Sequence, residues 1–252
     1  MPVYRPRHIE YTIVSGHIQI VLDDGTAMPA YWAHPDHNGR FPSIALLHDW
    51  WGITEVERRL SHLFAQIGFY VIVPDLFDGR VARNPQEAYA LVESIRDSAY
   101  PRVDAALHAL EHHLRSNGNV GAVGLGMGGT LAFEAALTRE DLEAAVAWYG
   151  FPQKYFGRFR DARAPIMAIY GEQENFVPQE AIRRLKRELA QSPLAHEVVI
   201  YPNTAREFFF TELVADSQDA GAQAWNRMLN FLDHFLMVRR ASTDDRPPTP
   251  QP

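Results

Sequence analysis

Short apolar runs alternate with amphipathic segments along most of the chain, and this alternation limits the possible folds more than any other feature. The runs 43–48, 69–74 and 120–125 are nearly continuous in apolar residues, as expected of strands buried on both faces. Segments with helical spacing separate these runs, such as 54–68, which ends on a glycine. Strands that alternate with helices predict an α/β fold with a mostly parallel central sheet and helices on both faces.

The same pattern continues through the chain and predicts one domain over residues 1–240. We expect strands at 18–22, 28–33, 43–48, 69–74, 120–125, 142–149, 165–170 and 196–201. We expect helices at 54–68, 84–98, 101–115, 128–138, 179–192 and 220–238, with a turn at 116–119. Residues 241–252 are polar and rich in proline, so we expect a disordered tail there.

Composition narrows the class of protein. The chain has 252 residues, of which 46% are hydrophobic and 22% charged, as in ordinary soluble globular proteins. It contains no cysteine, which excludes disulfides, thiolate metal sites and a cysteine nucleophile. A net charge of −7 without a basic block argues against nucleic-acid binding. With no membrane-length apolar run and no signal-peptide core at the start, we expect a soluble, cytoplasmic protein.

A glycine-rich turn at 124–128 is the most informative local motif. It follows the apolar run 120–125 and precedes a helical segment, in the pattern strand, Gly-x-Gly-x-Gly, helix. This is the context of the nucleophile elbow in α/β-hydrolases, whose central residue normally bears the reactive side chain. Here the centre is Gly126, which has none. The alternative is a glycine-rich strand–helix turn of another α/β fold, including a phosphate-binding turn.

Several further segments extend this similarity. They are Leu46-Leu47-His48-Asp49-Trp50-Trp51-Gly52, Pro74-Asp75-Leu76-Phe77-Asp78-Gly79-Arg80, Ala147-Trp148-Tyr149-Gly150, Ile169-Tyr170-Gly171-Glu172-Gln173-Glu174-Asn175-Phe176-Val177-Pro178 and Tyr201-Pro202-Asn203-Thr204-Ala205-Arg206-Glu207-Phe208-Phe209. The order and spacing of these segments, and the positions of their glycines and prolines, resemble those of the dienelactone hydrolase family from about residue 10 to about residue 237. The resemblance implies an α/β-hydrolase fold and hydrolysis of esters or lactones by a triad of Cys or Ser, Asp and His.

All three triad positions differ from the family pattern. The resemblance aligns the nucleophile with Gly126, the acid with Glu174 and the base with Arg206. Gly126 has no atom that can attack a substrate, and Arg206 stays protonated near neutral pH and cannot act as a base. The ordinary acyl-enzyme mechanism is therefore not possible. Because acid and base are neighbours in such a triad, we expect Glu174 and Arg206 to form a salt bridge; the alternative is two exposed surface charges.

The resemblance also implies a pocket at these positions. The backbone N–H groups of Met127 and Trp50 would form an oxyanion hole, and Asp49 matches a Glu that contacts the family's cysteine. We expect ligand contacts from Asp49, Trp50, Trp51, Arg80, Met127, Tyr149 and Phe176. Core packing is the alternative for the two tryptophans, and a solvated surface position is the alternative for Arg80. The histidines lack zinc-motif spacing, so we expect no metal and no cofactor.

Three functions remain open at this point. The first is a pseudo-hydrolase that binds a small molecule, such as a carboxylate, ester or lactone, without triad chemistry. The second is a hydrolase in which Asp49 or Glu174 activates a water beside a retained oxyanion hole. The third is a scaffold or oligomer subunit. We expect neither a nucleic acid nor a membrane as partner, and the oligomeric state is open.

Overall fold

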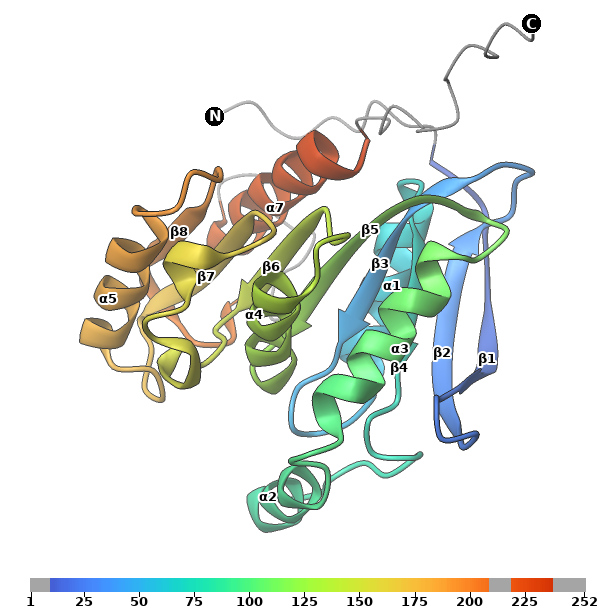
Figure 1. Cartoon of the computed structure of the whole chain (residues 1–252), viewed down its shortest axis with the longest axis horizontal. Helices are drawn as coiled ribbons and strands as arrows, with labels where there is room; N and C mark the ends of the chain where they lie inside the picture. Colours follow the sequence, from blue (N-terminus) through green and yellow to red (C-terminus); the bar gives the residue numbers. More distant parts are fainter. Residues whose placement is uncertain (1–9, 209–218, 238–252) are drawn as a thin grey trace, which may run out of the picture.

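A computed structural model describes residues 10–208 and 219–237 of the chain. Its centre is an eight-stranded sheet in the order β1-β2-β4-β3-β5-β6-β7-β8 (Figure 1). The strands are β1 (Ile13–Val21), β2 (Ala27–Pro35), β3 (Phe41–Leu47), β4 (Tyr70–Pro74), β5 (Ser116–Leu125), β6 (Ala144–Trp148), β7 (Ile166–Gln173) and β8 (Glu197–Ala205). β2 runs antiparallel to both of its neighbours, β1 and β4. The strands β4, β3, β5, β6, β7 and β8 run parallel to one another. The predicted mostly parallel α/β fold is confirmed.

Helices cover both faces of the sheet. They are α1 (Glu55–Gln66), α2 (Pro85–Ser94), α3 (Ala99–Glu111), α4 (Met127–Thr138), α5 (Gln179–Leu189) and α7 (Ala220–Leu236), with short 3-10 turns η1 (Gln153–Tyr155) and η2 (Phe159–Asp161). Figure 1 shows α3 and α4 in front of the sheet. On the other face, the rings of Phe64 in α1 and Trp225 in α7 lie 4.9 Å apart. None of the helices in the described ranges is both long and apolar enough to cross a membrane.

The strand and helix boundaries follow the local chemistry. Every residue of β3, β4 and β6 is buried, as their continuous apolar sequences predict for central strands. Thr54 precedes α1 and caps its N-terminus with a capping box. The Thr54 side chain accepts the backbone N–H of Glu57, and the Glu57 side chain accepts the backbone N–H of Thr54. Pro85 is the first residue of α2, where its missing N–H removes no helical hydrogen bond.

Several boundary predictions were wrong: β1 begins at Ile13 rather than 18, α2 ends at Ser94 rather than 98, and β8 extends to Ala205 rather than 201. Residues 116–119 were expected to form a turn, but they begin β5, where Ser116 pairs with Phe41 before the register shifts to Ser43 and Val120. Gly118, at φ +91°, takes up this irregularity within the strand. The helix expected at 101–115 spans Ala99–Glu111 instead, so Pro101 falls in its first turn. The tail expected at 241–252 lies outside the described residues.

The parallel strands bring distant parts of the sequence to one edge of the sheet. Asp49 lies just beyond β3, Gly126 follows β5 and Tyr149 follows β6. Glu174 follows β7, and Arg206 follows β8. The carboxyl ends of parallel strands are where ligands bind in open α/β sheets. Five separate segments therefore meet at the edge where a binding site is expected.

Candidate functional site

Gly126 forms a tight turn between β5 and α4. Its backbone has φ 51° and ψ −106°, a conformation that residues with a side chain rarely adopt. Its N–H donates to the carbonyl of Trp148 at 2.9 Å, and its carbonyl accepts from the N–H of Thr130 at 3.0 Å. At Gly124, a β-carbon would lie 2.1 Å from the carbonyl oxygen of Gly128. The glycines thus permit a sharp strand-to-helix turn with very close backbone contact.

The carboxylate of Asp49 fills the space beside this turn. Its Oδ1 accepts hydrogen bonds from the backbone N–H groups of Trp50, at 2.8 Å, and Met127, at 2.9 Å. A β-carbon at position 126 would lie 2.1 Å from Oδ1 and 2.4 Å from Oδ2 of Asp49. The N–H groups expected to form the oxyanion hole do converge, and the anionic oxygen they hold belongs to Asp49 itself.

Burial changes the ionisation of Asp49. Only 8% of this residue is exposed, and its removal from water raises the pKa of the carboxyl to about 6. The two N–H donors and the positive charge of Arg206 lower the pKa, whereas the negative charge of Glu207 raises it further. Asp49 is therefore an anion above about pH 6 and changes charge in a range where most carboxyls do not.

The predicted ion pair between Glu174 and Arg206 is confirmed. Nη1 of Arg206 lies 2.9 Å and 3.0 Å from the two carboxylate oxygens of Glu174. The Glu174 side chain is fully buried and that of Arg206 is 11% exposed. Oε1 of Glu174 also accepts the backbone N–H groups of Phe176 and Val177. The alternative of two exposed surface charges is wrong, because the carboxylate is buried and saturated with donors.

Arg206 lies among three aromatic rings. The carbon at the centre of its guanidinium is 4.5 Å from the ring centroid of Tyr149, 5.0 Å from that of Phe151 and 5.1 Å from that of Phe176. Such contacts stabilise a cation. Its Nε and Nη2 groups have no hydrogen-bond partner among residues 10–208 and 219–237. Arg206 is thus a fixed cation that keeps N–H donors for a further partner.

A cavity of about 740 Å³ opens beside these groups. Of the residues expected to contact a ligand, it is lined by Asp49, Trp50, Trp51, Met127 and Phe176, together with Arg206. The remaining lining residues are Pro85, Val92, Glu93, Ile95, Arg96, Ala99, Thr130, Leu131, Phe151, Lys154, Tyr155 and Glu207. Sequence reasoning missed this second group. The apolar residues that α2 and α3 contribute have the same spacing as core residues and carry no separate signal.

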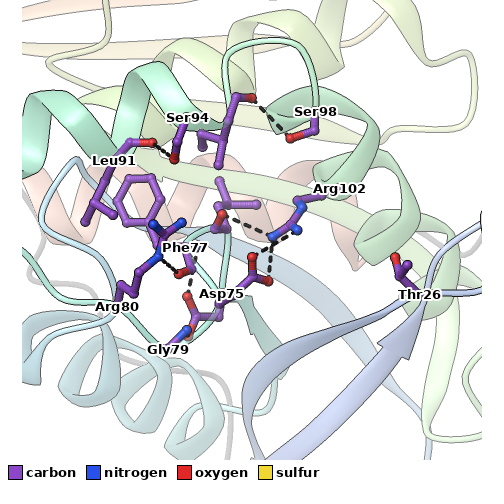
Figure 2. A network of polar contacts seen from close by, with 12 residues as sticks. Thr26, Asp75, Phe77, Gly79, Arg80, Leu91, Ser94, Ser98 and Arg102 are labelled. Carbon is purple, nitrogen blue, oxygen red and sulfur yellow. Dashed lines mark hydrogen bonds and ion pairs between the residues drawn. The ribbon is translucent and has the colours of Figure 1, made fainter.

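Two expected contact residues lie elsewhere. Nε of Arg80 donates to the carbonyl of Phe77 at 2.9 Å (Figure 2). Arg80 is not among the residues that line the cavity. Tyr149 is buried beneath Arg206 rather than on the cavity wall. Burial raises the pKa of the Tyr149 hydroxyl well above its usual value. Figure 2 also shows Asp75, whose carboxylate accepts the N–H groups of Phe77 and Gly79 and so shapes the loop after β4.

His48 is adjacent to Asp49 in sequence, but its ring nitrogens form hydrogen bonds with backbone groups. Its Nδ1 lies 2.7 Å from the carbonyl oxygen of Asp49, and its Nε2 accepts the N–H of Leu76 at 3.1 Å. Complete burial lowers the pKa of the imidazole, which keeps it neutral. One ring nitrogen must therefore donate and the other accept, so both are committed to the backbone. His48 therefore does not form a catalytic couple with the Asp49 carboxylate.

A separate group of polar side chains lies at the C-terminal end of α3, where His112 is the residue after the helix. His108, Glu111 and His112 each place one ligand-type atom within 4.8 Å of the others. Glu111 and His112 follow His108 by three and four residues, a spacing that puts the three side chains on one helix face. This spacing differs from that of zinc motifs such as His-Glu-x-x-His. Glu111 also bonds to Arg139, at 3.4 Å.

Comparison with known proteins agrees with this architecture. The model of the dienelactone hydrolase family matches residues 28–236. "Protein usf" of Aquifex pyrophilus is 28% identical over 224 residues, which cover 84% of this chain and 96% of that protein. "Putative carboxymethylenebutenolidase" of Escherichia coli (strain K12) is 28% identical over 242 residues, 88% of each chain. The crystal structure of a "Putative Dienelactone Hydrolase" from Klebsiella pneumoniae superposes with a TM-score of 0.77, at 24% identity, over 89% of this chain and 100% of that one.

Proposed function

This chain belongs to the dienelactone hydrolase family, and we propose that it binds a small organic molecule beside Asp49 without forming an acyl-enzyme. One observation carries the proposal. The Asp49 carboxylate occupies both the N–H donors of Trp50 and Met127 and the space a side chain at Gly126 would need. A substrate carbonyl therefore meets neither a nucleophile at the elbow nor free backbone N–H donors of Trp50 and Met127 for its oxygen.

The residues at the other two triad positions support the same conclusion. By the family resemblance, Glu174 and Arg206 stand at the positions of the acid and the base. Arginine remains protonated at all ordinary pH values, so it cannot remove a proton from a nucleophile. The two side chains instead neutralise each other in a buried ion pair. This pair supplies a rigid wall for a binding site rather than a proton relay.

The cavity has the properties of a small-molecule site. Its volume of about 740 Å³ lies within the usual range for organic ligands, and its walls are mainly apolar and aromatic. The unbonded N–H groups of Arg206 could bond a carboxylate or carbonyl oxygen, which favours a carboxylate, ester or lactone as ligand. Lys154 and Arg96 also line the cavity, but each is paired with a glutamate.

Hydrolysis by a water activated at Asp49 is the second candidate. The relatives named as carboxymethylenebutenolidases favour it. The arrangement of Asp49 weighs against it, because a substrate oxyanion would need the same two N–H groups that Oδ1 already occupies. Glu174 could not replace Asp49 as the base, since its carboxylate is buried and bonded to Arg206.

Paired activity and binding assays test the proposal. We expect para-nitrophenyl butyrate and a dienelactone to be hydrolysed only at the background rate, beside an active relative with an intact triad. Phenylpropionate, its methyl ester and phenethyl alcohol serve as binding probes. At ten times its dissociation constant, a ligand adds about 1.4 kcal/mol of stability, or roughly 3 °C in melting temperature.

The variant Ala99→Phe narrows the cavity and provides the matched control. It should abolish the shift in melting temperature while leaving the protein folded. Ester turnover that Asp49→Asn removes would contradict the proposal, as would the failure of all three probes to stabilise the protein.

A further inference from the structure

The Asp49 carboxylate lies where a side chain at the elbow would present its reactive atom. Its oxygens are 2.1 Å and 2.4 Å from the position of a β-carbon on residue 126, and Asp49 lines the cavity. Resting on the proposed function of this cavity as an organic-ligand site, we propose that Asp49 is a nucleophile that accepts an alkyl group from a bound organic halide or epoxide. The reactive group then comes from the loop after β3 rather than from the elbow itself.

The hydrogen bonds of Asp49 select the kind of electrophile. Oδ1 is held by Trp50 and Met127, whereas Oδ2 has no hydrogen-bond partner in the described part of the chain. Attack on an ester would place negative charge on the substrate's carbonyl oxygen, and both backbone N–H groups beside the turn are already bonded to Oδ1. Attack on a saturated carbon places that charge on the leaving group instead. The site is therefore suited to saturated carbon.

The alkylation step needs no histidine base. A hydroxyl or thiol must lose its proton to attack, whereas a carboxylate is already an anion at neutral pH. Arg206 lines the same cavity and has Nε and Nη2 without a partner among the described residues. A fixed cation with unused N–H groups stabilises a departing halide or alkoxide. An arginine is thus more useful than a histidine in this reaction.

The reaction balances with water as the second reactant. Oδ2 forms a bond to the substrate carbon while the bond from that carbon to its leaving group breaks, and the leaving group departs with the electron pair. A halide leaves as an anion, and an epoxide oxygen takes a proton from water. The product is an alkyl ester of Asp49, whose carbonyl oxygen Oδ1 stays bonded to Trp50 and Met127.

Hydrolysis of this ester restores the enzyme. Water adds to the Asp49 carboxyl carbon, and the two N–H groups stabilise the charge that develops on Oδ1. The alcohol leaves with Oδ2, one oxygen from water stays on Asp49, and one proton is released to solvent. The two N–H donors that are unavailable to an ester substrate are therefore placed correctly for the second half of this reaction.

Covalent labelling provides the direct test. We would incubate the full chain with phenethyl bromide or phenyl glycidyl ether and locate adducts by peptide mass spectrometry. The absence of cysteine removes the usual competing nucleophile. We expect the label on Asp49, reduced at least tenfold in Asp49→Asn. Asp36→Asn is the matched control, because it removes an exposed carboxylate that does not line the cavity and should leave the label on Asp49 unchanged.

Turnover in ¹⁸O-labelled water covers the case in which the ester is too short-lived to detect. In a single turnover the heavy oxygen should appear in Asp49, and the alcohol should carry an ordinary oxygen. Heavy oxygen in an alcohol from phenethyl bromide would mean that water attacked directly, which overturns the proposal.

The absence of adduct and alcohol would also overturn the proposal. Binding of phenethyl alcohol in the melting assay would then show that the organic-ligand site itself stands. Absence of both reaction and binding would remove the proposed function as well.

Discussion

A side chain at position 126 and the present position of Asp49 exclude each other. A β-carbon on Gly126 would lie 2.1 Å from Oδ1 of Asp49, well inside the contact distance of the two atoms. The Asp49 carboxylate reaches this position because the N–H groups of Trp50 and Met127 hold it there. Glycine at the elbow and aspartate after β3 thus form one structural unit.

This relationship predicts strong coupling between the two positions. Gly126→Ala should destabilise the protein by about 3 kcal/mol, because the methyl group meets the Asp49 carboxylate and the backbone is in a glycine-favoured conformation. In an Asp49→Ala background the same substitution should cost at least about 1 kcal/mol less. Urea denaturation of the four proteins in this cycle measures the difference. Additive effects would show that the two positions do not compete for space.

The buried ion pair predicts that losing one partner is worse than losing both charges. Arg206→Met leaves the Glu174 carboxylate buried without a cation, so we expect a loss of about 3–5 kcal/mol in unfolding free energy. Adding Glu174→Gln should recover part of that loss, because the amide oxygen can still accept the N–H groups of Phe176 and Val177. Chemical denaturation checks both values. A double variant less stable than Arg206→Met would contradict this account.

The raised pKa of Asp49 predicts a pH-dependent stability. The folded protein binds this proton more tightly than the unfolded chain, so the contribution is favourable below about pH 4 and is lost as pH rises to about 6. The shift from 3.8 to about 6 corresponds to about 3 kcal/mol. Asp49→Asn should therefore gain stability relative to the native protein between pH 4 and pH 7. Asp36→Asn, which removes an exposed carboxylate outside the cavity, provides the control. A pH profile for Asp49→Asn that runs parallel to that of the native protein would refute the assignment.

The rate at which Asp49 is alkylated should depend on the same ionisation. Ionisation lowers the stability of the folded protein, but it produces the reactive form of Asp49. Only the anion attacks, so the rate of labelling should rise through about pH 6 and become constant above it. Arg206 lowers this midpoint, whereas Glu207 raises it. Glu207→Gln should consequently shift the midpoint slightly downward. Labelling rates between pH 4 and pH 8 test this, and a rate independent of pH would argue against a carboxylate nucleophile.

Much of this architecture is predictable from sequence. The apolar runs that became β3, β4 and β6 identify central strands because burial on both faces leaves no polar position. The ion pair between Glu174 and Arg206 was predictable because the family resemblance places these residues at the acid and base positions of a triad, which are neighbours in space. The position of the Asp49 carboxylate was not predictable, because it depends on the space that the missing side chain of Gly126 leaves open. The cavity wall from α2 was also missed, since its apolar residues resemble those of a core.

The most direct test of the central claim is the release of para-nitrophenol from para-nitrophenyl butyrate by the native protein, Asp49→Asn and Arg206→Met. If Asp49 occupies the N–H donors and no acyl-enzyme forms, all three proteins should release it at the same background rate, without an initial burst. A stoichiometric burst from the native protein, or steady turnover that either substitution abolishes, would contradict the account.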